Sequence, residues 1–137
     1  MTDMNDFNKQ IIAEFRANGG KGSGMFEAVP LLLLTTKGAK SGQPRTTPLI
    51  YVTDGDRLVT MASKGGAPTH PDWYHNIVAD PDVTVEVGRE TFPARAEIAP
   101  ERERTRLVDA VAEIWPPLRQ YEQNTERTIP VVTLTRV

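Results

Sequence analysis

The chain has 137 residues, a net charge of −2 and no cysteine, and this length is typical of a single domain. The slight excess of acidic residues argues against general affinity for nucleic acid, and the lack of cysteine excludes a disulfide framework, a thiolate nucleophile and a cysteine zinc site. The longest apolar run is far shorter than the ~20 residues that a membrane span needs. The first residues also lack the basic start and apolar core of a signal peptide. We therefore expect a cytoplasmic protein.

An amphipathic helix is predicted at the start of the chain. Met4, Phe7, Ile11 and Phe15 follow one another at helical spacing, and a pair of glycines at 19 and 20 ends the pattern. The narrow apolar stripe indicates a helix that lies on the core or on a partner subunit. The alternative is membrane association through weak peripheral contact of this helix, which the mixed charges of its other face do not favour.

A glycine-rich connector follows the helix, and the chain divides there. We expect residues 1–25 to form the helix and a flexible segment, and residues 26–137 to form one folded domain. The first strand is predicted over 29–36, where a nearly unbroken apolar run indicates burial on both faces. Two more strands, over 45–53 and 57–63, are joined by "TDGDR", whose turn chemistry is typical of a hairpin.

The second half of the chain continues the mixture of helices and strands. Asp72 is expected to cap a short helix over 73–79. Alternating valines predict a half-buried strand over 83–87, and Pro93 indicates that the strand over 91–98 is an edge strand or carries a bulge.

Pro100 is expected to open a longer helix that ends near residue 115, with the charged start "ERERTR" on a solvated face. A final strand is predicted over 129–136. The total is about six mostly antiparallel strands and two to three helices, which indicates an α+β protein built on a small barrel flanked by helices.

One loop, "TTKGAKSGQPRTTP", is basic although the chain is acidic. Lys40 and Arg45 lie five positions apart across a glycine turn, so both can converge on one point. The glycines allow inward-facing N–H groups, and Ser41, Thr46 and Thr47 add hydroxyl donors. This set suits phosphate or carboxylate, while an ordinary basic hairpin loop is the alternative.

A second stretch, "ASKGGAPTHPDWYHN", repeats the combination of a lysine, glycines and a helix start. Trp73 and Tyr74 add flat apolar faces for a ring system, although core packing is the alternative for both. Together the two stretches predict a cradle for a long anionic cofactor with an aromatic head. We do not expect a metal site at His70, Asp72 and His75, because their spacing is unequal and a fourth ligand is absent nearby.

Three stretches, "LLLTTKGAKSGQPRTTPLIY", "MASKGGAPTHPDWYHNIVADP" and "TERTIPVV", strongly resemble the deazaflavin-dependent nitroreductase family of F420-dependent oxidoreductases. The order and spacing hold from about Met25 to Val132. The resemblance implies a split β-barrel of the FMN-binding type and coenzyme F420 as the redox cofactor. It also implies hydride transfer from F420H2 to an electron-poor organic acceptor, such as a quinone, an enone or unsaturated lactone, or a nitroaromatic compound.

The resemblance further implies the site residues. The anionic end of F420 is expected at the basic loop, and its ring is expected along 48–51 and 61–64, with 72–76 closing over it. The implied cofactor contacts are Ala39, Lys40, Ser41, Arg45, Thr46, Thr47, Pro48, Leu49, Ile50, Tyr51, Met61, Ala62, Ser63, Lys64, Asp72, Trp73, Tyr74, His75 and Asn76.

The implied substrate pocket contains Trp115, Leu118 and Tyr121, where the best-known family member has tyrosines. Only one tyrosine remains here, so we expect a more apolar substrate mouth. Ser63 is the expected catalytic hydrogen-bond donor, and Tyr121 is expected to line the pocket or supply a proton.

Two alternatives remain at this point: an FMN-binding split-barrel oxidoreductase, and a non-catalytic protein that binds or sequesters F420. We expect a small-molecule hydride acceptor as the partner, no nucleic acid and no stable membrane insertion, in a monomer or homodimer.

Overall fold

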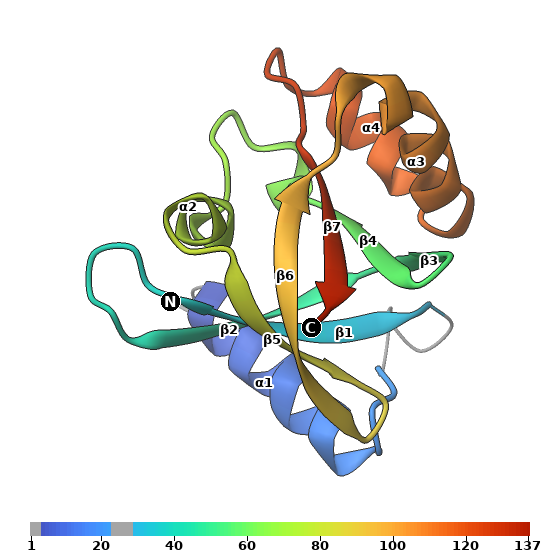
Figure 1. The fold of residues 1–137 in the computed structure, drawn as a ribbon. Helices are drawn as coiled ribbons and strands as arrows, with labels where there is room; N and C mark the ends of the chain where they lie inside the picture. Colours follow the sequence, from blue (N-terminus) through green and yellow to red (C-terminus); the bar gives the residue numbers. More distant parts are fainter. Residues whose placement is uncertain (1–3, 23–28) are drawn as a thin grey trace.

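The computed structural model describes residues 4–22 and 29–137, and its centre is a seven-stranded antiparallel sheet that curls into a barrel (Figure 1). The strands are β1 (Leu31–Lys37), β2 (Pro44–Ile50), β3 (Val52–Asp54), β4 (Arg57–Met61), β5 (Asp82–Val87), β6 (Glu90–Ile98) and β7 (Val131–Arg136). Their order is β2-β1-β5-β6-β7-β4-β3. The predicted α+β split barrel is confirmed. The strand total differs from the prediction because the run over 45–53 bends at Tyr51 and forms two strands.

This bend closes the barrel. β2 and β3 stand at opposite ends of the sheet order, yet only Tyr51 separates them in the chain. Thr60 of β4 donates a hydrogen bond to the carbonyl of Ile50 at 2.8 Å, which ties β4 to the bend. Beyond this point the second edge of β2 has no strand neighbour among the described residues. The barrel is therefore split where β2 and β4 separate.

Four α-helices and one short 3-10 helix surround the sheet in the described part of the chain. They are α1 (Met4–Ala17), η2 (Lys64–Gly66), α2 (Asp72–Ala79), α3 (Glu101–Ile114) and α4 (Pro117–Gln123). Figure 1 shows α3 and α4 together at one end of the barrel, with α1 along the outside of β1 and β2. None of the described helices combines the length and the apolar character that crossing a membrane requires.

The helix α1 is a core element. Ile11 and Phe15 are buried against Leu31 and Leu33 of β1, so the interpretation as a helix that lies on the core is confirmed. Phe7 is exposed. The glycine-rich connector predicted after α1 lies partly outside the described residues, since residues 23–28 are not described.

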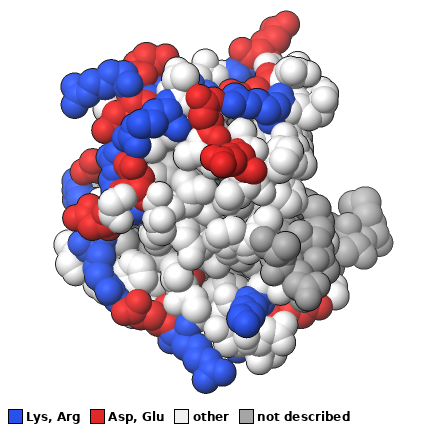
Figure 2. Space-filling view, turned by 90° about the vertical axis from the view of Figure 1, so that its right-hand side faces the viewer, with Lys and Arg blue, Asp and Glu red and all other residues white. Residues whose placement is uncertain are grey.

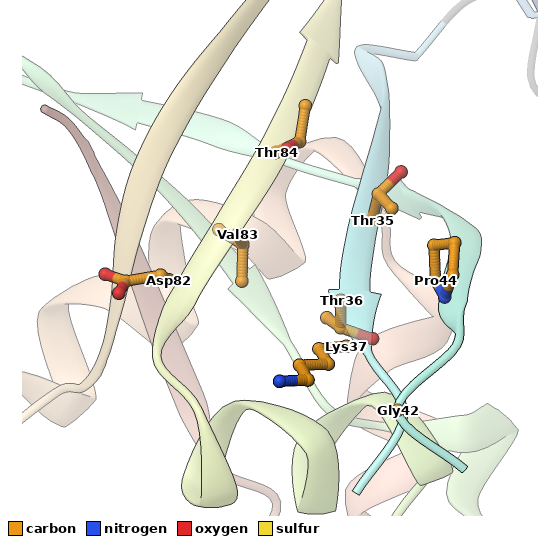
Figure 3. Close-up of a pocket in the computed structure, with 8 residues that line it drawn as sticks. All are labelled: Thr35, Thr36, Lys37, Gly42, Pro44, Asp82, Val83 and Thr84. Atoms are coloured by element: carbon orange, nitrogen blue, oxygen red, sulfur yellow. The ribbon is translucent and has the colours of Figure 1, made fainter.

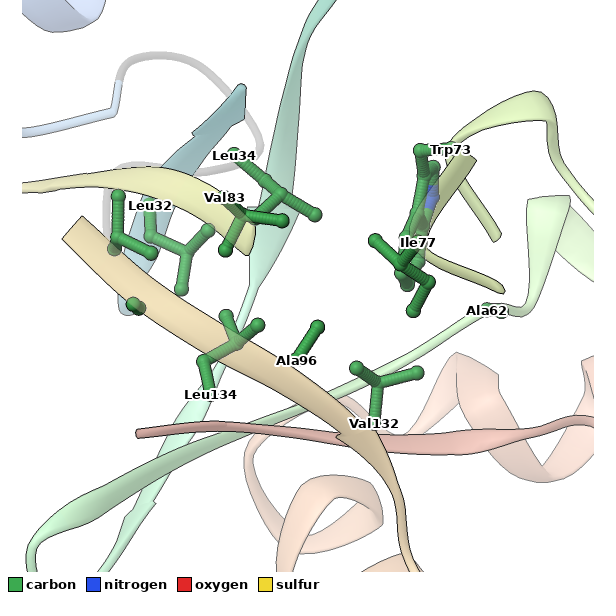
Figure 4. Close-up of a cluster of buried hydrophobic side chains, with 11 residues drawn as sticks. Leu32, Leu34, Ala62, Trp73, Ile77, Val83, Ala96, Val132 and Leu134 are labelled. Carbon is green, nitrogen blue, oxygen red and sulfur yellow. The ribbon is translucent and has the colours of Figure 1, made fainter. Parts of the chain in front are cut away.

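The strand β1 is buried on both faces, as its leucine run predicts. Leu31 and Leu33 face α1, whereas Leu32 and Leu34 point into the barrel interior, and all four are at most 4% exposed. Figure 4 shows that Trp73 and Ile77 of α2 enter this same interior cluster. Burial of each such side chain contributes roughly 1.5–3 kcal/mol, so these contacts fix α2 to the barrel.

A second cluster joins α3 and α4 to β4 and β7. Its fully or nearly fully buried members include Leu107 and Val111 of α3, Leu118 of α4 and Met61 of β4. The charged start of α3 is predicted to be a solvated face, but one of its residues is used in packing. Arg104 donates a hydrogen bond to the carbonyl of Ile129 at 2.6 Å. Its charges thus help to attach the helix to the segment before β7.

Two local predictions are wrong. Pro71, not Asp72, occupies the N-cap of α2, and Asp72 is the first helical residue and is exposed. β6, which contains Pro93, is an interior strand between β5 and β7. The carbonyl of Pro93 accepts from the N–H of Val137, so this side of Pro93 faces the end of the β6–β7 ladder. The nitrogen of Pro93 lies on the same side, just beyond the last pair of that ladder. The proline is therefore tolerated, because its missing N–H interrupts no hydrogen bond between paired residues.

Candidate functional site

The basic loop is the tip of the β1–β2 hairpin. Strand pairing runs from Leu31 opposite Ile50 to Lys37 opposite Pro44, so residues 38–43 form the turn. The N–H of Gly38 donates to the carbonyl of Gln43 at 2.8 Å, and the N–H of Gly42 donates to that of Gly38 at 2.9 Å. The Ser41 hydroxyl accepts from the Gln43 N–H at 3.2 Å. The loop is therefore organised by its own hydrogen bonds.

The cations of this hairpin are not neutralised by the protein. Lys37, Lys40 and Arg45 are exposed, and none of them forms an ion pair with a carboxylate among the described residues. Elsewhere, on the face shown in Figure 2, basic and acidic residues alternate along the rim. Concentrated, unpaired positive charge on an ordered turn is suited to an anionic ligand.

Asn76 of α2 clamps this hairpin to the barrel. Its Oδ1 accepts from the N–H of Ala39 at 2.9 Å, and its Nδ2 donates to the hydroxyl of Thr36 at 3.0 Å. The side chain is 6% exposed and both of its polar ends are occupied by protein partners. Asn76 and Ala39, two residues implied as cofactor contacts, thus bind each other and fix the direction of the hairpin.

A shallow groove opens on the outer side of the same hairpin, where β1 and β5 separate beyond the Thr35–Thr84 pair (Figure 3). The side chain of Lys37 points into the space between the two strands, and Asp82 lies on the opposite strand. The carboxylate of Asp82 points away from this space and pairs with Arg95 of β6 at 3.7 Å. Since Lys37 is the one cation among the lining residues, the groove suits a long anionic tail less well than the hairpin tip does.

The predicted contacts on β2 divide between two faces, because successive side chains of a strand alternate. Leu49 and Tyr51 lie against the interior cluster, and Arg45 and Thr47 share their face by alternation. The three residues Thr46, Pro48 and Ile50 take the other face, where the Thr46 hydroxyl bonds that of Thr35 at 2.8 Å and Ile50 packs on the α1 cluster. One ligand can meet only one of these sets through side chains.

The second basic stretch forms the link from β4 to α2. Lys64 has φ +48, in the left-handed region that non-glycine residues rarely adopt, and its Nζ donates to the hydroxyl of Thr69 at 3.1 Å. Gly66 has φ +84, and a Cβ there would lie 3.0 Å from the Cα and carbonyl oxygen of Tyr121. The two expected catalytic residues, Ser63 and Tyr121, therefore come from segments that pack together.

Sequence reasoning missed Arg127, which organises this link. It donates to the carbonyls of Ala62 at 3.2 Å, Ser63 at 2.9 Å and Ala67 at 2.9 Å, and its Nη1 lies 2.9 Å from Nδ1 of His70. Arginine is a donor only, so Nδ1 accepts. Burial, reinforced by the charge of Arg127 and by His75, lowers the pKa of His70. Arg127 lies in "TERTIPVV", but nothing in that stretch identifies its partners.

The aromatic residues around this link are only partly available. Tyr74 is partly buried and its ring centroid lies 4.6 Å from that of His70. Burial raises the pKa of Tyr51, so its phenol stays a hydrogen-bond donor. Trp73 is 5% exposed, in agreement with the core-packing alternative. Met61 and Leu118 are buried as well, so their side chains offer no surface to a ligand.

The other implied residues lie at the surface or near it. Lys64, Asp72 and His75 are exposed, whereas Trp115 and Tyr121 are partly buried against the α3–α4 cluster. Within residues 4–22 and 29–137, no three His, Asp or Glu side chains are grouped so that they could hold a metal ion.

The seven-stranded sheet that curls into a split barrel gives this chain a fold of the FMN-binding split-barrel-like class. A family model described as "F420H(2)-dependent quinone reductase" matches residues 8–136, and the chain belongs to this family. This confirms the predicted class, an F420-dependent oxidoreductase.

Individual relatives agree. An F420H(2)-dependent quinone reductase of Mycobacterium tuberculosis is 42% identical over 127 residues, covering 87% of this chain and 82% of the relative. A solved F420-H2 dependent reductase, FDR-A, is 40% identical with a TM-score of 0.71, covering 77% of this chain and 93% of that one. A structure described as a domain-swapped dimer is 34% identical with a TM-score of 0.73, covering 96% and 99%.

Proposed function

We propose that this protein transfers a hydride from F420H2 to a quinone, and that its own residues bind, orient and shield the two reactants. When bound, the reduced deazaflavin supplies the hydride. The observation that carries the proposal is the set of unneutralised cations, Lys40 and Arg45, on a hairpin that Asn76 holds in place. These cations would hold the phosphate and carboxylates of the cofactor by charge-assisted hydrogen bonds.

The ring system would lie on the other side of the split, between β2 and the link from β4 to α2. The phenol of Tyr51, the ring of Tyr74 and the backbone of Ser63 and Lys64 are the groups available there. The Ser63 hydroxyl would donate to the oxygen on which negative charge develops during transfer. Such a donor is most effective when it is already positioned, and the packing of η2 on α4 provides that positioning.

The acceptor would enter beside Trp115 and Tyr121, the partly buried aromatic residues of the pocket predicted from the family resemblance. An apolar, aromatic mouth fits a quinone ring better than a small polar substrate. Tyr121 would line this mouth and serve as a proton source. Enones, unsaturated lactones and nitroaromatic compounds are the other acceptors to be compared.

A monomer and a homodimer are both compatible with this site, and the domain-swapped dimer among the structural relatives makes the homodimer the first assembly to test. The proposed location is the cytoplasm. If α1 makes weak contact with a membrane surface, the exposed Phe7 would be the residue that inserts, because Ile11 and Phe15 are buried in the protein.

The test is a fluorescence titration of the purified protein with F420, with FMN in a parallel cell. Binding of F420 without FMN supports the proposal, whereas binding of FMN alone would replace it with an FMN-dependent reductase. F420H2 oxidation is then followed with menadione and with an enone. Tight F420 binding without turnover of any acceptor would identify a cofactor-sequestering protein instead.

A further inference from the structure

Arg127 is a part-buried cation that bonds no carboxylate in the described part of the chain. Burial lowers its pKa, so the protein bears the cost of desolvating this guanidinium. The hydrogen bonds of its guanidinium all go to one segment, the link from β4 to α2. Among the described residues, the guanidinium therefore acts on this link.

The hydrogen bonds of Arg127 also determine where the N–H groups of the bonded peptides point. In a trans peptide the C=O and the N–H point to opposite sides. Because the guanidinium binds the carbonyls of Ala62 and Ser63, the N–H groups of the same two peptides, those of Ser63 and Lys64, point away from it. Neither N–H has a protein acceptor among the described residues. Hydrogen bonding to a carbonyl polarises its peptide and strengthens the N–H as a donor.

We propose that Arg127 is a positioning residue for the cofactor: through the carbonyls of Ala62 and Ser63 and the ring of His70, it fixes and polarises the Ser63 and Lys64 N–H groups as donors to oxygen atoms of the bound deazaflavin. The inference rests on the proposed function. It assigns to Arg127 no contact with the cofactor itself, and it explains why a strained Lys64 backbone is retained.

His70 extends the same arrangement to Tyr74. The groups that face the His70 ring are Arg127, from the segment before β7, and Tyr74 and His75, from α2. No carboxylate of residues 4–22 or 29–137 contacts this ring. A protonated Nδ1 cannot accept from Arg127. Protonation of His70 would therefore release this corner of the link.

The test compares Arg127→Lys and Arg127→Gln with Arg104→Lys. Arg104 is a matched control, since it also donates to a main-chain carbonyl, that of Ile129, without touching the link. We expect the Arg127 variants to weaken F420 binding about tenfold to a hundredfold in a fluorescence titration, the loss expected when two main-chain hydrogen-bond donors to the cofactor are no longer held in position. Arg104→Lys should lower the melting temperature and leave the F420 affinity unchanged. Amide exchange at 62–66 should rise only in the Arg127 variants.

The unmodified protein provides a second readout. Since the folded-state pKa of His70 is lowered from 6.5, F420 affinity should be constant above pH 6.5 and should fall as the pH drops below it. His70→Asn keeps an acceptor near the position of Nδ1 and does not titrate, so it should flatten this part of the profile.

The outcomes separate the two proposals. If the unmodified protein does not bind F420, the proposed function fails. If it binds, but Arg127→Lys binds equally well and shows no change in amide exchange, Arg127 is a structural residue and the inference is overturned. Should Arg127→Gln not fold, Arg127→Lys and the pH profile decide the question: a profile that His70→Asn leaves unaltered overturns the role of His70.

Discussion

Two regions of this molecule use basic side chains in opposite ways. At the β3–β4 turn, Arg57 bonds Asp54 at 2.7 Å and Glu103 at 3.2 Å, and Arg106 bonds Asp54 at 2.7 Å. At the β1–β2 turn, the cations Lys40 and Arg45 have no carboxylate among the described residues. The cations of the first turn are paired with carboxylates of the fold, whereas the cations of the second turn remain available to bind an anionic ligand.

The strongest way to break this comparison is to remove the hairpin cations. We expect Lys40→Ala and Arg45→Ala each to weaken F420 binding about tenfold to a hundredfold, because each removes a charge-assisted bond. The free energy of unfolding should not change, since neither side chain forms an ion pair with any residue that the structure describes. The measurements are a fluorescence titration and a urea titration of the same preparations.

A control for net charge is Lys9→Ala on α1, which removes one exposed cation far from the hairpin in sequence. Normal F420 affinity in both hairpin variants would contradict the claim that the hairpin cations bind the cofactor. Equal weakening in Lys9→Ala would show that only total charge matters.

A second prediction concerns Asn76, which connects the hairpin to the fold. Asn76→Ala removes both of its hydrogen bonds and leaves the N–H of Ala39 and the hydroxyl of Thr36 without these partners. We expect a loss of roughly 1–3 kcal/mol in the free energy of unfolding and weaker F420 binding, because the turn is no longer held in one direction. Calorimetry and the fluorescence titration check the two effects.

Thr36→Val is the matched variant, since it removes the bond to Nδ2 and keeps the bond from Ala39. It should lower stability and retain most of the F420 affinity. If both variants lose affinity equally, Asn76 does not act by orienting the hairpin.

What the sequence could predict follows from the range of each interaction. The leucine run of β1, the Asp54–Gly55 turn and the basic hairpin are local patterns, and the structure confirms all three. The bond from Ala39 to Asn76 joins residues 37 positions apart, and that from Arg127 to His70 joins residues 57 apart. Contacts between residues so far apart in the sequence cannot be predicted from a local sequence pattern.

The assignment of aromatic residues shows the same limit. Trp73 and Tyr74 are neighbours on a short helix, and their types alone suit either a ring-shaped ligand or a core. Only the way α2 is attached decides that Trp73 enters the barrel while Tyr74 stays at its edge. Likewise the period of β2 shows which residues alternate, but the position of α1 decides which face is covered.

A smaller effect is expected at the paired region. Arg57→Ala should lower the free energy of unfolding by less than Asn76→Ala does, because two carboxylates at a partly exposed site lose a donor. F420 affinity should stay normal, since the β3–β4 turn lies at a different end of the barrel from the hairpin tip (Figure 1). A variant that unfolds at the same urea concentration as the parent would remove the structural role given to this pair.

The smallest effect is a change in acid stability. Hydrogen bonds from Arg106 and then from Arg57 lower the pKa of Asp54 from 3.8 to about 2. A carboxyl group with a lowered folded-state pKa stabilises the protein above its unfolded pKa, and this contribution is lost as the pH falls from 3.8 towards about 2. Asp54→Asn cannot titrate, so its urea midpoint should vary less with pH in this window and approach that of the parent at the acid end. Identical pH dependence in the two proteins would mean that the charge of Asp54 does not stabilise the folded state. The two turns would then differ in the positions of their charged groups but not in what those charges contribute to stability.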